Sequence, residues 1–320
     1  MRTDIPNAGQ IMSRLRILLS LMTTENYYQQ QHASAAQEVA QRLDVDLQIV
    51  YADNDPLRQR DQLLQVIHGT DTRPDGIICA PVGTTMAQVA RPAVGAGIGW
   101  AVLNRECDYM ADLRQNSDSV PVFSVGPDQS EIGRIQGRQI SALLPDGGLV
   151  LYILGSSTNP IVEYRRLMML SAKPASVQVM TLSGNWSEQS GYKAISAWLR
   201  LSTSHITPVN LVAAQCDDMA LGARKAFQDN TQGKEREQWL KLPFIGVDGC
   251  PGAGQKWVRN GLLTATVVNP PTAGRALETM VRAIRSRSKP AEYTLVAPAS
   301  LPGVECLESA PWQAPQFSEI

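Results

Sequence analysis

The sequence predicts an α/β protein built on parallel β-sheets. The first observation is that short apolar runs alternate with segments of helix length, as is typical of β–α–β units. The second is that runs such as 242–247 are apolar throughout, as expected for strands buried on both faces. The third is the length of 320 residues, which is enough for two hydrophobic cores of ordinary size.

Each predicted element has a local signal. The first strand is an apolar run at 15–21, and the second, at 45–51, alternates apolar and polar residues. Asp55 and Pro56 begin a helix, because aspartate is a good N-cap and proline fits the first helical position. Further strands are expected at 75–80, 98–103, 120–125, 149–153, 177–181, 209–213, 242–247 and 263–268. Helices are expected at 27–43, from 56 onward, and at 84–96, 129–144, 160–172, 187–202, 217–229 and 251–260.

The stretch 244–271 brings two polar side chains to neighbouring strand ends. One buried strand ends at Asp248, and after a short helix closed by Gly261 a second strand runs into Asn269. Pro270 can open the following helix. Ligands of open α/β sheets bind outside the carboxyl ends of the strands. Asp248 and Asn269 are therefore candidate ligand-binding residues, and Asp248 is the strongest single candidate.

Composition narrows the possible functions. Hydrophobic residues make up 43% of the chain and charged residues 18%, which is typical of a soluble globular protein without membrane insertion. A net charge of −1 gives no electrostatic reason to expect nucleic acid as a partner. The five cysteines are odd in number and far apart, and the three histidines lack metal-ligand spacing. We therefore expect no disulfide framework, metal or cofactor.

The N-terminal segment bears on localisation. Residues 14–22 are basic and then apolar, which faintly resembles a signal peptide, but no small-residue cleavage site follows. The same run is needed as the first strand, so we interpret it as a strand. The compartment stays open between periplasm and cytoplasm. At the other end, residues 311–320 are expected to form a flexible tail.

Four motifs occur in an order that is more specific than any one of them. They are Y-A-D-N-D-P from Tyr51, P-D-G-I-I from Pro74, D-D-M-A-L-G-A from Asp217, and G-V-D-G…N-G-x-L-x-A-T-V-x-N-P from Gly246. In this respect residues 15–295 resemble the sugar-binding periplasmic proteins of the ribose-binding type. They also resemble the ligand-sensing domains of LacI-type repressors.

The resemblance implies two doubly wound parallel-sheet lobes joined by a three-crossover hinge. The N-terminal lobe would comprise 14–125 and 270–293, and the C-terminal lobe 126–269 and 294–310. It also implies that Asp248 and Asn269 hold sugar hydroxyls, which planar carboxylate, amide and guanidinium groups satisfy in pairs.

Aromatic residues are expected at such a site because the apolar faces of a sugar ring favour aromatic surface. Tyr27 and Tyr28 match the family's aromatic pair after the first strand, although both also fit the core of the following helix. Trp186 matches a ring-stacking residue of the opposite lobe. Asn104 and Arg105 match an Asp-Arg pair, and the amide in place of the carboxylate weakens acceptance from two hydroxyls. This replacement puts ribose or glucose itself in doubt.

Four further positions carry weaker expectations. Either Arg165 or Arg166 matches an arginine in the first turns of its helix, because the residues that fix the register are missing. Asp128 is either a ligand acceptor or the N-cap of the next helix. Cys216 stands where the family usually has asparagine, and it can still contact an apolar part of a ligand.

These features favour a non-enzymatic binding protein for a sugar or polyol that serves an ABC-type transporter or a signalling receptor. The alternative is a cytoplasmic sensing domain of a regulatory system, without a DNA-binding motif of its own, since only about fourteen residues precede the first strand. A dehydrogenase is disfavoured because the turn 22–26 has no glycine. No P-loop or G-x-S-x-G motif is present in the sequence.

Overall fold

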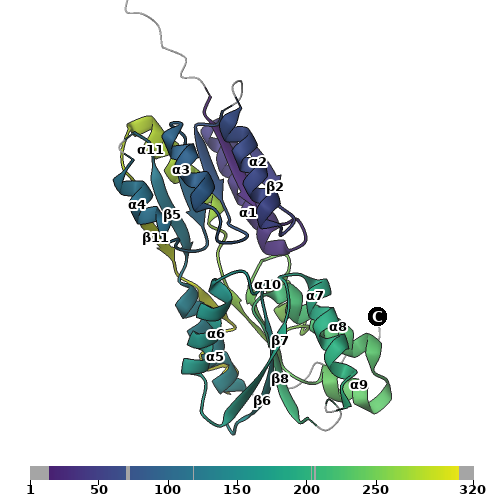
Figure 1. Cartoon of the computed structure of the whole chain (residues 1–320). Coiled ribbons are helices and arrows are strands. Elements are labelled where there is room, and N and C mark those ends of the chain that lie inside the picture. Colours follow the sequence, from purple (N-terminus) through teal and green to yellow (C-terminus); the bar gives the residue numbers. More distant parts are fainter. Residues whose placement is uncertain (1–13, 70–72, 118, 203, 205–206, 310–320) are drawn as a thin grey trace, which may run out of the picture.

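The computed structural model describes all residues except 1–13, 70–72, 118, 203, 205–206 and 310–320. The expected tail at 311–320 lies outside the described residues. The chain forms two lobes, one above the other in Figure 1, with a waist between them. Among the described helices, none combines the length and apolarity needed to cross a bilayer.

Two sheets, each of six strands within the described residues, form the centres of the two lobes. Across the first sheet lie β11 (Tyr293–Val296), β5 (Val122–Pro127), β4 (Gly99–Leu103), β3 (Gly76–Cys79), β1 (Arg16–Leu21) and β2 (Asp46–Tyr51). Across the second lie β12 (Ala299–Leu301), β10 (Ala265–Val268), β9 (Phe244–Asp248), β8 (Val209–Ala214), β6 (Gly148–Leu154) and β7 (Val177–Ser183). All neighbours are parallel except β10 and β12.

Helices cover both faces of each sheet, so the predicted doubly wound architecture is confirmed. The first lobe has α1 (Tyr27–Leu43) and α11 (Ala273–Ser286) on one face, with α2 (Pro56–His68), α3 (Ala87–Gly95) and α4 (Tyr109–Gln115) on the other. The second lobe has α7 (Glu188–Leu199), α8 (Asp217–Asn230), α9 (Gly233–Leu240) and α10 (Gly254–Arg259) on one face, with α5 (Gln129–Leu143), α6 (Ile161–Ala172) and α12 (Val304–Ser309) on the other. In both sheets the strand order reverses next to the first strand, which opens a crevice at the carboxyl ends.

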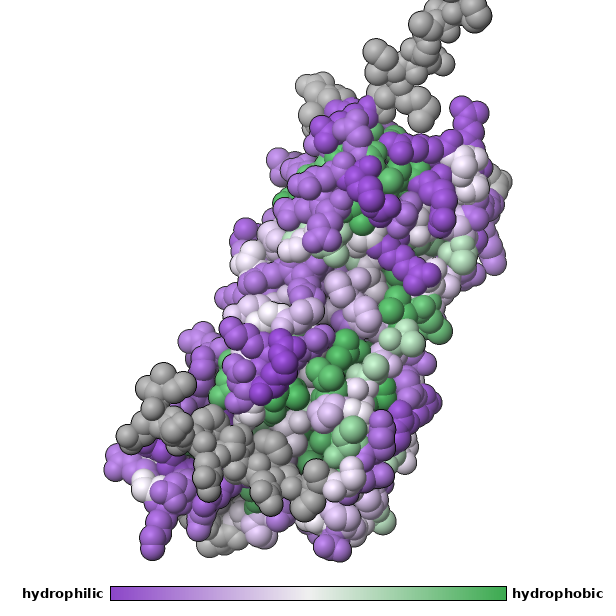
Figure 2. Space-filling model, turned by 180° about the vertical axis from the view of Figure 1, so that it is seen from behind, coloured by the Kyte–Doolittle hydropathy of each residue, from purple (hydrophilic) through white to green (hydrophobic). Residues whose placement is uncertain are grey.

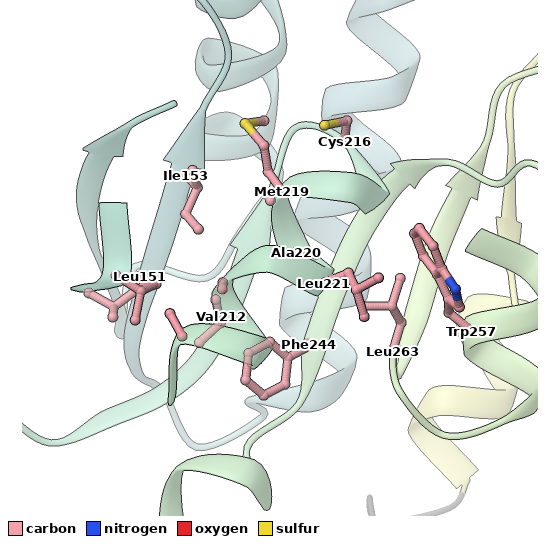
Figure 3. Packing of buried hydrophobic residues seen from close by; sticks show 14 of the residues in the cluster. Leu151, Ile153, Val212, Cys216, Met219, Ala220, Leu221, Phe244, Trp257 and Leu263 are labelled. Atoms are coloured by element: carbon pink, nitrogen blue, oxygen red, sulfur yellow. The ribbon is translucent and has the colours of Figure 1, made fainter. Parts of the chain in front are cut away.

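The cores follow from strands that are apolar on both sides. In β1, Ile17 and Leu19 pack toward α1 and α11, while Leu18 packs toward α2 and α3. In the second lobe, Figure 3 shows Val212 of β8 beside Ala220 of α8. Such burial contributes about 1.5–3 kcal/mol for each large aliphatic side chain. Figure 2 shows mostly hydrophilic residues on this face of the first lobe, and apolar residues gathered at the waist and on the second lobe.

The chain crosses between lobes three times, and two crossovers lie later than the sequence suggested. The expected boundaries at 125/126 and 293/294 fall inside β5 and β11, because the whole of β11 pairs with residues 124–127 of β5. Their ladder includes Gly126 with Leu295 and Pro127 with Val296, and it holds both strands in the first sheet. The third crossover, between β10 and α11, includes the expected boundary at 269/270.

Candidate ligand site between the lobes

A small cavity lies where the carboxyl ends of the two sheets face each other across the waist. Its free space is about 50 Å³, which suits a small molecule rather than a polymer. The first lobe contributes Met22, Asn26, Tyr28, Gln29, Ala80, Pro81, Leu103, Asn104 and Arg105. The second lobe contributes Gln129, Asn159, Ile161, Arg165, Trp186, Cys216, Asp248 and Asn269. The site is therefore complete only when both lobes are present.

The cavity brings together eight of the eleven residues that the sequence singled out. They are Tyr28, Asn104, Arg105, Arg165, Trp186, Cys216, Asp248 and Asn269. Tyr27, Asp128 and Arg166 do not line it. Eight of the predicted site residues therefore lie together around one cavity. The other three, each adjacent in sequence to a lining residue, lie outside it.

Three lining residues adopt backbone conformations that L-amino acids rarely occupy. The φ angle is 69° at Asn104, 62° at Trp186 and 106° at Asp248. Each residue follows or ends a strand, where the chain turns sharply to aim the side chain into the cavity. Strain of this kind costs about 1–3 kcal/mol per residue and tends to gather at functional sites.

Asp248 is the buried carboxyl group of the cavity. Burial raises its pKa to about 7, and the nearby Arg165 guanidinium lowers it. Asp217 supports the turn that follows, since its carboxylate accepts hydrogen bonds from Gly249 N at 2.7 Å and from Thr266 Oγ1 at 2.7 Å. The Asp217 side chain is therefore committed to this turn, although the residue itself is the first of α8.

Arg165 faces the site, which resolves the alternative between the two arginines. Its Nε donates to Gln129 Oε1 at 2.8 Å and its Nη1 to the Gln215 carbonyl at 2.9 Å. Its guanidinium carbon lies 5.8 Å from the Trp186 ring centroid, a cation–π distance. Arg166, one residue further around the helix, pairs with Glu163 at 2.7 Å and points away.

The Trp186 ring packs directly against the backbone of Gly155. A Cβ atom at Gly155 would lie 2.1 Å from the indole ring, so only glycine leaves room for the ring. The indole is 7% exposed, and its Nε1 has no hydrogen-bond partner among the described residues. An aromatic face and one free donor therefore border the cavity.

Asn104 lies at the centre of a second network. Its Oδ1 accepts from the Tyr28 hydroxyl at 3.3 Å and the Thr272 hydroxyl at 3.2 Å. His32 lies behind it, with Nδ1 accepting from Ala273 N at 3.1 Å. Burial lowers the pKa of His32 to about 3, which the nearby Asn104 side chain partly opposes. Burial raises the pKa of Tyr28, so its hydroxyl stays a donor.

Two further buried side chains, Arg105 and Asn269, have polar atoms that lack hydrogen-bond partners of good geometry. Arg105 donates from Nη2 to the Gly83 carbonyl, while its Nε and Nη1 have no partner among the described residues. The Asn269 amide lies near enough to Tyr28 and Asp248 to lower their pKa values, but it makes no hydrogen bond of good geometry in the described structure. Buried polar groups are nearly always satisfied, so these atoms are candidates for contact with a bound molecule.

The three residues outside the cavity have local roles. Tyr27 is 42% exposed and packs edge-on against Trp257 with ring centroids 5.5 Å apart. Asp128 is the N-cap of α5 and accepts from Glu131 N at 2.9 Å. For Asp128 the structure favours the capping alternative.

Sequence reasoning missed four polar lining residues. Asn26, which caps α1, also donates from Nδ2 to the Trp186 carbonyl of the other lobe at 3.3 Å. Gln29 accepts from Met22 N at 3.0 Å, and Gln129 donates to the Asn104 carbonyl at 2.6 Å. The fourth is Asn159, whose Oδ1 accepts from Ile161 N at the start of α6. Each lies in the loop or first helical turn that follows a strand, and this position was the signal that could have found them.

Comparison with known proteins agrees with this architecture. A sequence profile described as a periplasmic binding protein domain matches residues 17–287. No curated protein sequence matches the chain.

Three similar solved structures show the same fold. An ABC transporter periplasmic solute binding protein from Actinobacillus succinogenes with bound D-allose is 21% identical, with a TM-score of 0.77 over 93% of this chain and 100% of that one. A solute binding protein from Bacillus halodurans with bound myo-inositol is 21% identical, with a TM-score of 0.75 over 95% and 99%. A fructose binding periplasmic domain of a hybrid two-component system is 20% identical, with a TM-score of 0.74 over 92% and 94%.

Proposed function

Because the chain belongs to the family of periplasmic binding protein domains, we propose that it binds a small sugar or polyol between its lobes without transforming it. The single observation that carries this proposal is the set of buried, unpartnered polar atoms of Arg105, Trp186 and Asn269 around one small cavity. Hydroxyl groups donate and accept, so a polyhydroxy ligand can satisfy such a mixed set.

The remaining lining supports the same ligand chemistry. The Trp186 indole offers an apolar face beside polar atoms, and Asp248 offers a carboxylate that accepts from hydroxyls. The similar structures whose descriptions name a ligand hold allose or inositol or bind fructose, all of them small polyhydroxy compounds.

Two groups that could act in catalysis, Cys216 in the lining and His32 behind it, are unsuited to turnover. Burial raises the pKa of the Cys216 thiol, which keeps it in the poorly nucleophilic protonated form. His32 is committed to Ala273 N through Nδ1, and burial lowers its pKa to about 3. Neither group suits nucleophilic or general-base catalysis near neutral pH.

We further propose that the bound form is read by a membrane partner, an ABC-type transporter or a receptor. The receptor option has the support of the similar fructose binding periplasmic domain, which belongs to a two-component system. The alternative is a cytoplasmic sensing domain of a regulatory system without a DNA-binding motif of its own. Both alternatives use the same site and the same non-catalytic binding.

A thermal-shift screen against sugars and polyols, followed by calorimetry, tests the proposal. A ligand at about a hundred times its Kd adds about 2.7 kcal/mol of stability, a readily visible shift. Asp248→Asn should weaken binding about tenfold or more, because hydrogen bonds to a charged group contribute about 1.5–3 kcal/mol each. Asp128→Asn is the matched control, since it makes the same change outside the cavity and asparagine still caps a helix. Equal loss in both variants, or none in Asp248→Asn, would remove Asp248 from the site.

A further inference from the structure

We propose that the ligand of this site is an acidic sugar or polyol, with a carboxylate held by Arg105 and Asn104. Aldonic and uronic acids are the compounds of this class. This inference rests on the proposed function and makes its ligand class specific. Three observations carry it: the bonding of the Arg105 guanidinium, the orientation of the Asn104 amide, and the balance of charge in the cavity.

Arg105 is a buried cation without a bonded anion. The residue is 6% exposed and borders the cavity. Of its three guanidinium nitrogens, Nη2 donates to the neutral Gly83 carbonyl, and Nε and Nη1 make no hydrogen bond of good geometry in the described structure, although the guanidinium lies near enough to the neutral Cys107 thiol to lower its pKa. A buried ion is costly unless it is paired and hydrogen-bonded. An anionic group on the ligand would supply the missing partner.

The surroundings offer no substitute for that anion. Glu106, Asp108 and Asp128 border a neighbouring hollow together with Arg105. None of them bonds to the guanidinium, whose one bonded nitrogen is taken by a carbonyl. Glu106 and Asp108 are exposed to solvent, and Asp128 caps α5.

The Asn104 amide is oriented so that it can donate to a ligand. Because Ala273 N donates to His32 Nδ1, a neutral His32 carries its proton on Nε2, which makes no hydrogen bond of good geometry among the described residues. The Asn104 oxygen accepts from the hydroxyls of Tyr28 and Thr272, which sets the orientation of the amide. Its NH₂ group is left to face other partners. The loop after β4 therefore offers the cavity an amide donor beside the Arg105 guanidinium.

The balance of charge in the cavity points the same way. Among its lining residues, the described charged side chains are Arg105, Arg165 and Asp248. Asp248 lies in the field of Arg165, so one positive charge has no counterpart. Arg165 is also held by Gln129 and Gln215, which leaves Arg105 as the available cation. One free guanidinium and one amide suit a single carboxylate better than a phosphate, which carries about −1.5 to −2 charges and three acceptor oxygens.

Calorimetry at about pH 8, where carboxylates are ionised, tests the inference with matched compounds. The probes are glucose, gluconate and glucuronate, galactose, galactonate and galacturonate, myo-inositol, and glucose 6-phosphate. We expect at least one acid to bind about tenfold or more tighter than its neutral counterpart, as loss of a charged hydrogen bond implies. Neutral compounds that bind as tightly as their acids would overturn the acidic ligand while leaving the proposed function intact. Tightest binding of the phosphate would overturn the carboxylate assignment, and no binding by any probe would overturn both proposals.

Two variants make the test specific to these residues. Asn104→Asp keeps an acceptor for Tyr28 and Thr272 but places a negative charge beside the ligand, so acids should lose about tenfold or more and the neutral sugars should gain. Arg105→Gln should weaken the acids and leave the neutral sugars nearly unchanged. Arg166→Gln, which removes a guanidinium paired with Glu163 outside the cavity, is the control. Acids that bind Asn104→Asp as tightly as the wild type would also overturn the inference, provided circular dichroism shows the variant folded.

Discussion

Asp248 combines a strained backbone with a buried carboxyl group. Its φ of 106° places it among the conformations that asparagine and glycine tolerate better than most residues. Burial raises its pKa to about 7 from an ordinary value of 3.8. The strained backbone and the burial of the carboxyl group both lower the free energy of unfolding. The same strained turn directs the carboxyl group into the cavity, where it can accept hydrogen bonds.

The raised pKa of Asp248 predicts a definite effect of pH on stability. Between pH about 3.8 and about 7 the folded protein keeps a proton that the unfolded chain has released. The free energy of unfolding that this group contributes therefore falls as pH rises through that window and levels above it. We expect Asp248→Asn, which cannot ionise, to gain stability relative to wild type as pH rises toward 7. Urea denaturation at a series of pH values measures the difference.

The exposed Asp229→Asn in α8 controls for the general loss of a carboxylate. If the stability of Asp248→Asn ran parallel to that of wild type from pH about 4 to about 7, the carboxyl would not be protonated in the folded protein and the prediction would be wrong.

Single residues show how far the sequence could predict the site. Asp248 and Asn269 could be predicted as site residues because each follows a clear apolar run in the sequence, which marks the end of a strand. Arg165 and Arg166 could not be separated, because successive helical residues differ in direction by about 100° and only packing sets the phase. Asn26 could not be found from the sequence, because its contact with the Trp186 carbonyl crosses between lobes.

Helix α1 is the element that joins the two lobes opposite the crossovers. Its N-cap Asn26 donates to the Trp186 carbonyl, and Tyr27 packs on Trp257. The backbone N–H of Tyr27 also bonds to the Asp218 carboxylate at the start of α8. A carboxylate at a helix N-terminus satisfies a free N–H and meets the positive end of the helix dipole. The first turn of α1 thus fastens the lobes together.

Asp218→Ala should loosen this fastening. The change leaves the Tyr27 N–H without its acceptor. Burial raises the pKa of Asp218 to about 7, so at about pH 8 the group is ionised, and a hydrogen bond to a charged group contributes about 1.5–3 kcal/mol. We expect amide exchange at residues 27–30 to rise about tenfold or more, since these N–H groups open when the lobes part. Hydrogen–deuterium exchange measured on intact protein records the change.

Asp218→Asn retains an acceptor and should restore part of the protection, and Asp229→Asn should leave it unchanged. Protection at residues 27–30 that is equal in Asp218→Ala and wild type would show that this contact does not hold the lobes.

Longer helices and strands could be predicted from the sequence, and the shortest ones could not. Strands and helices of the β–α–β alternation follow from period and caps, and the structure has them close to the expected positions. The short strands β11 and β12 escaped prediction because four and three residues at a sheet edge carry too little pattern. Helix α9 formed from a mixed-charge segment without any buried residue, so its apolar pattern was too weak to detect.

At the scale of the whole molecule, the site exists only between lobes that can move. Tyr28, Asn104 and Arg105 come from one lobe, and Trp186 and Asp248 from the other. The free space of about 50 Å³ is small, and contacts such as Asn26 with the Trp186 carbonyl join its walls. The structure is thus a closed form, and a ligand needs the lobes to separate before it can enter.

The crossovers are suited to that motion. Gly126 is held in the β5–β11 ladder, so rotation at these two crossovers falls after Pro127 and after Val296. Pro270 and Pro271 stiffen the crossover after β10. Hinge motions of this kind concentrate rotation in a few residues at element ends.

We therefore predict that ligand shifts the protein from a mixture of open and closed forms to the closed form. A ligand that contacts both lobes binds the closed form more tightly, so it must raise the closed population. Small-angle scattering should give a larger radius of gyration without ligand than with saturating ligand, and the liganded curve should fit the structure in Figure 1. Asp218→Ala should enlarge the ligand-free value further, because it removes a contact of the closed form alone. An unchanged radius, with binding confirmed by calorimetry, would mean that the lobes are already closed in solution and that entry occurs by a local opening of the α1 turn.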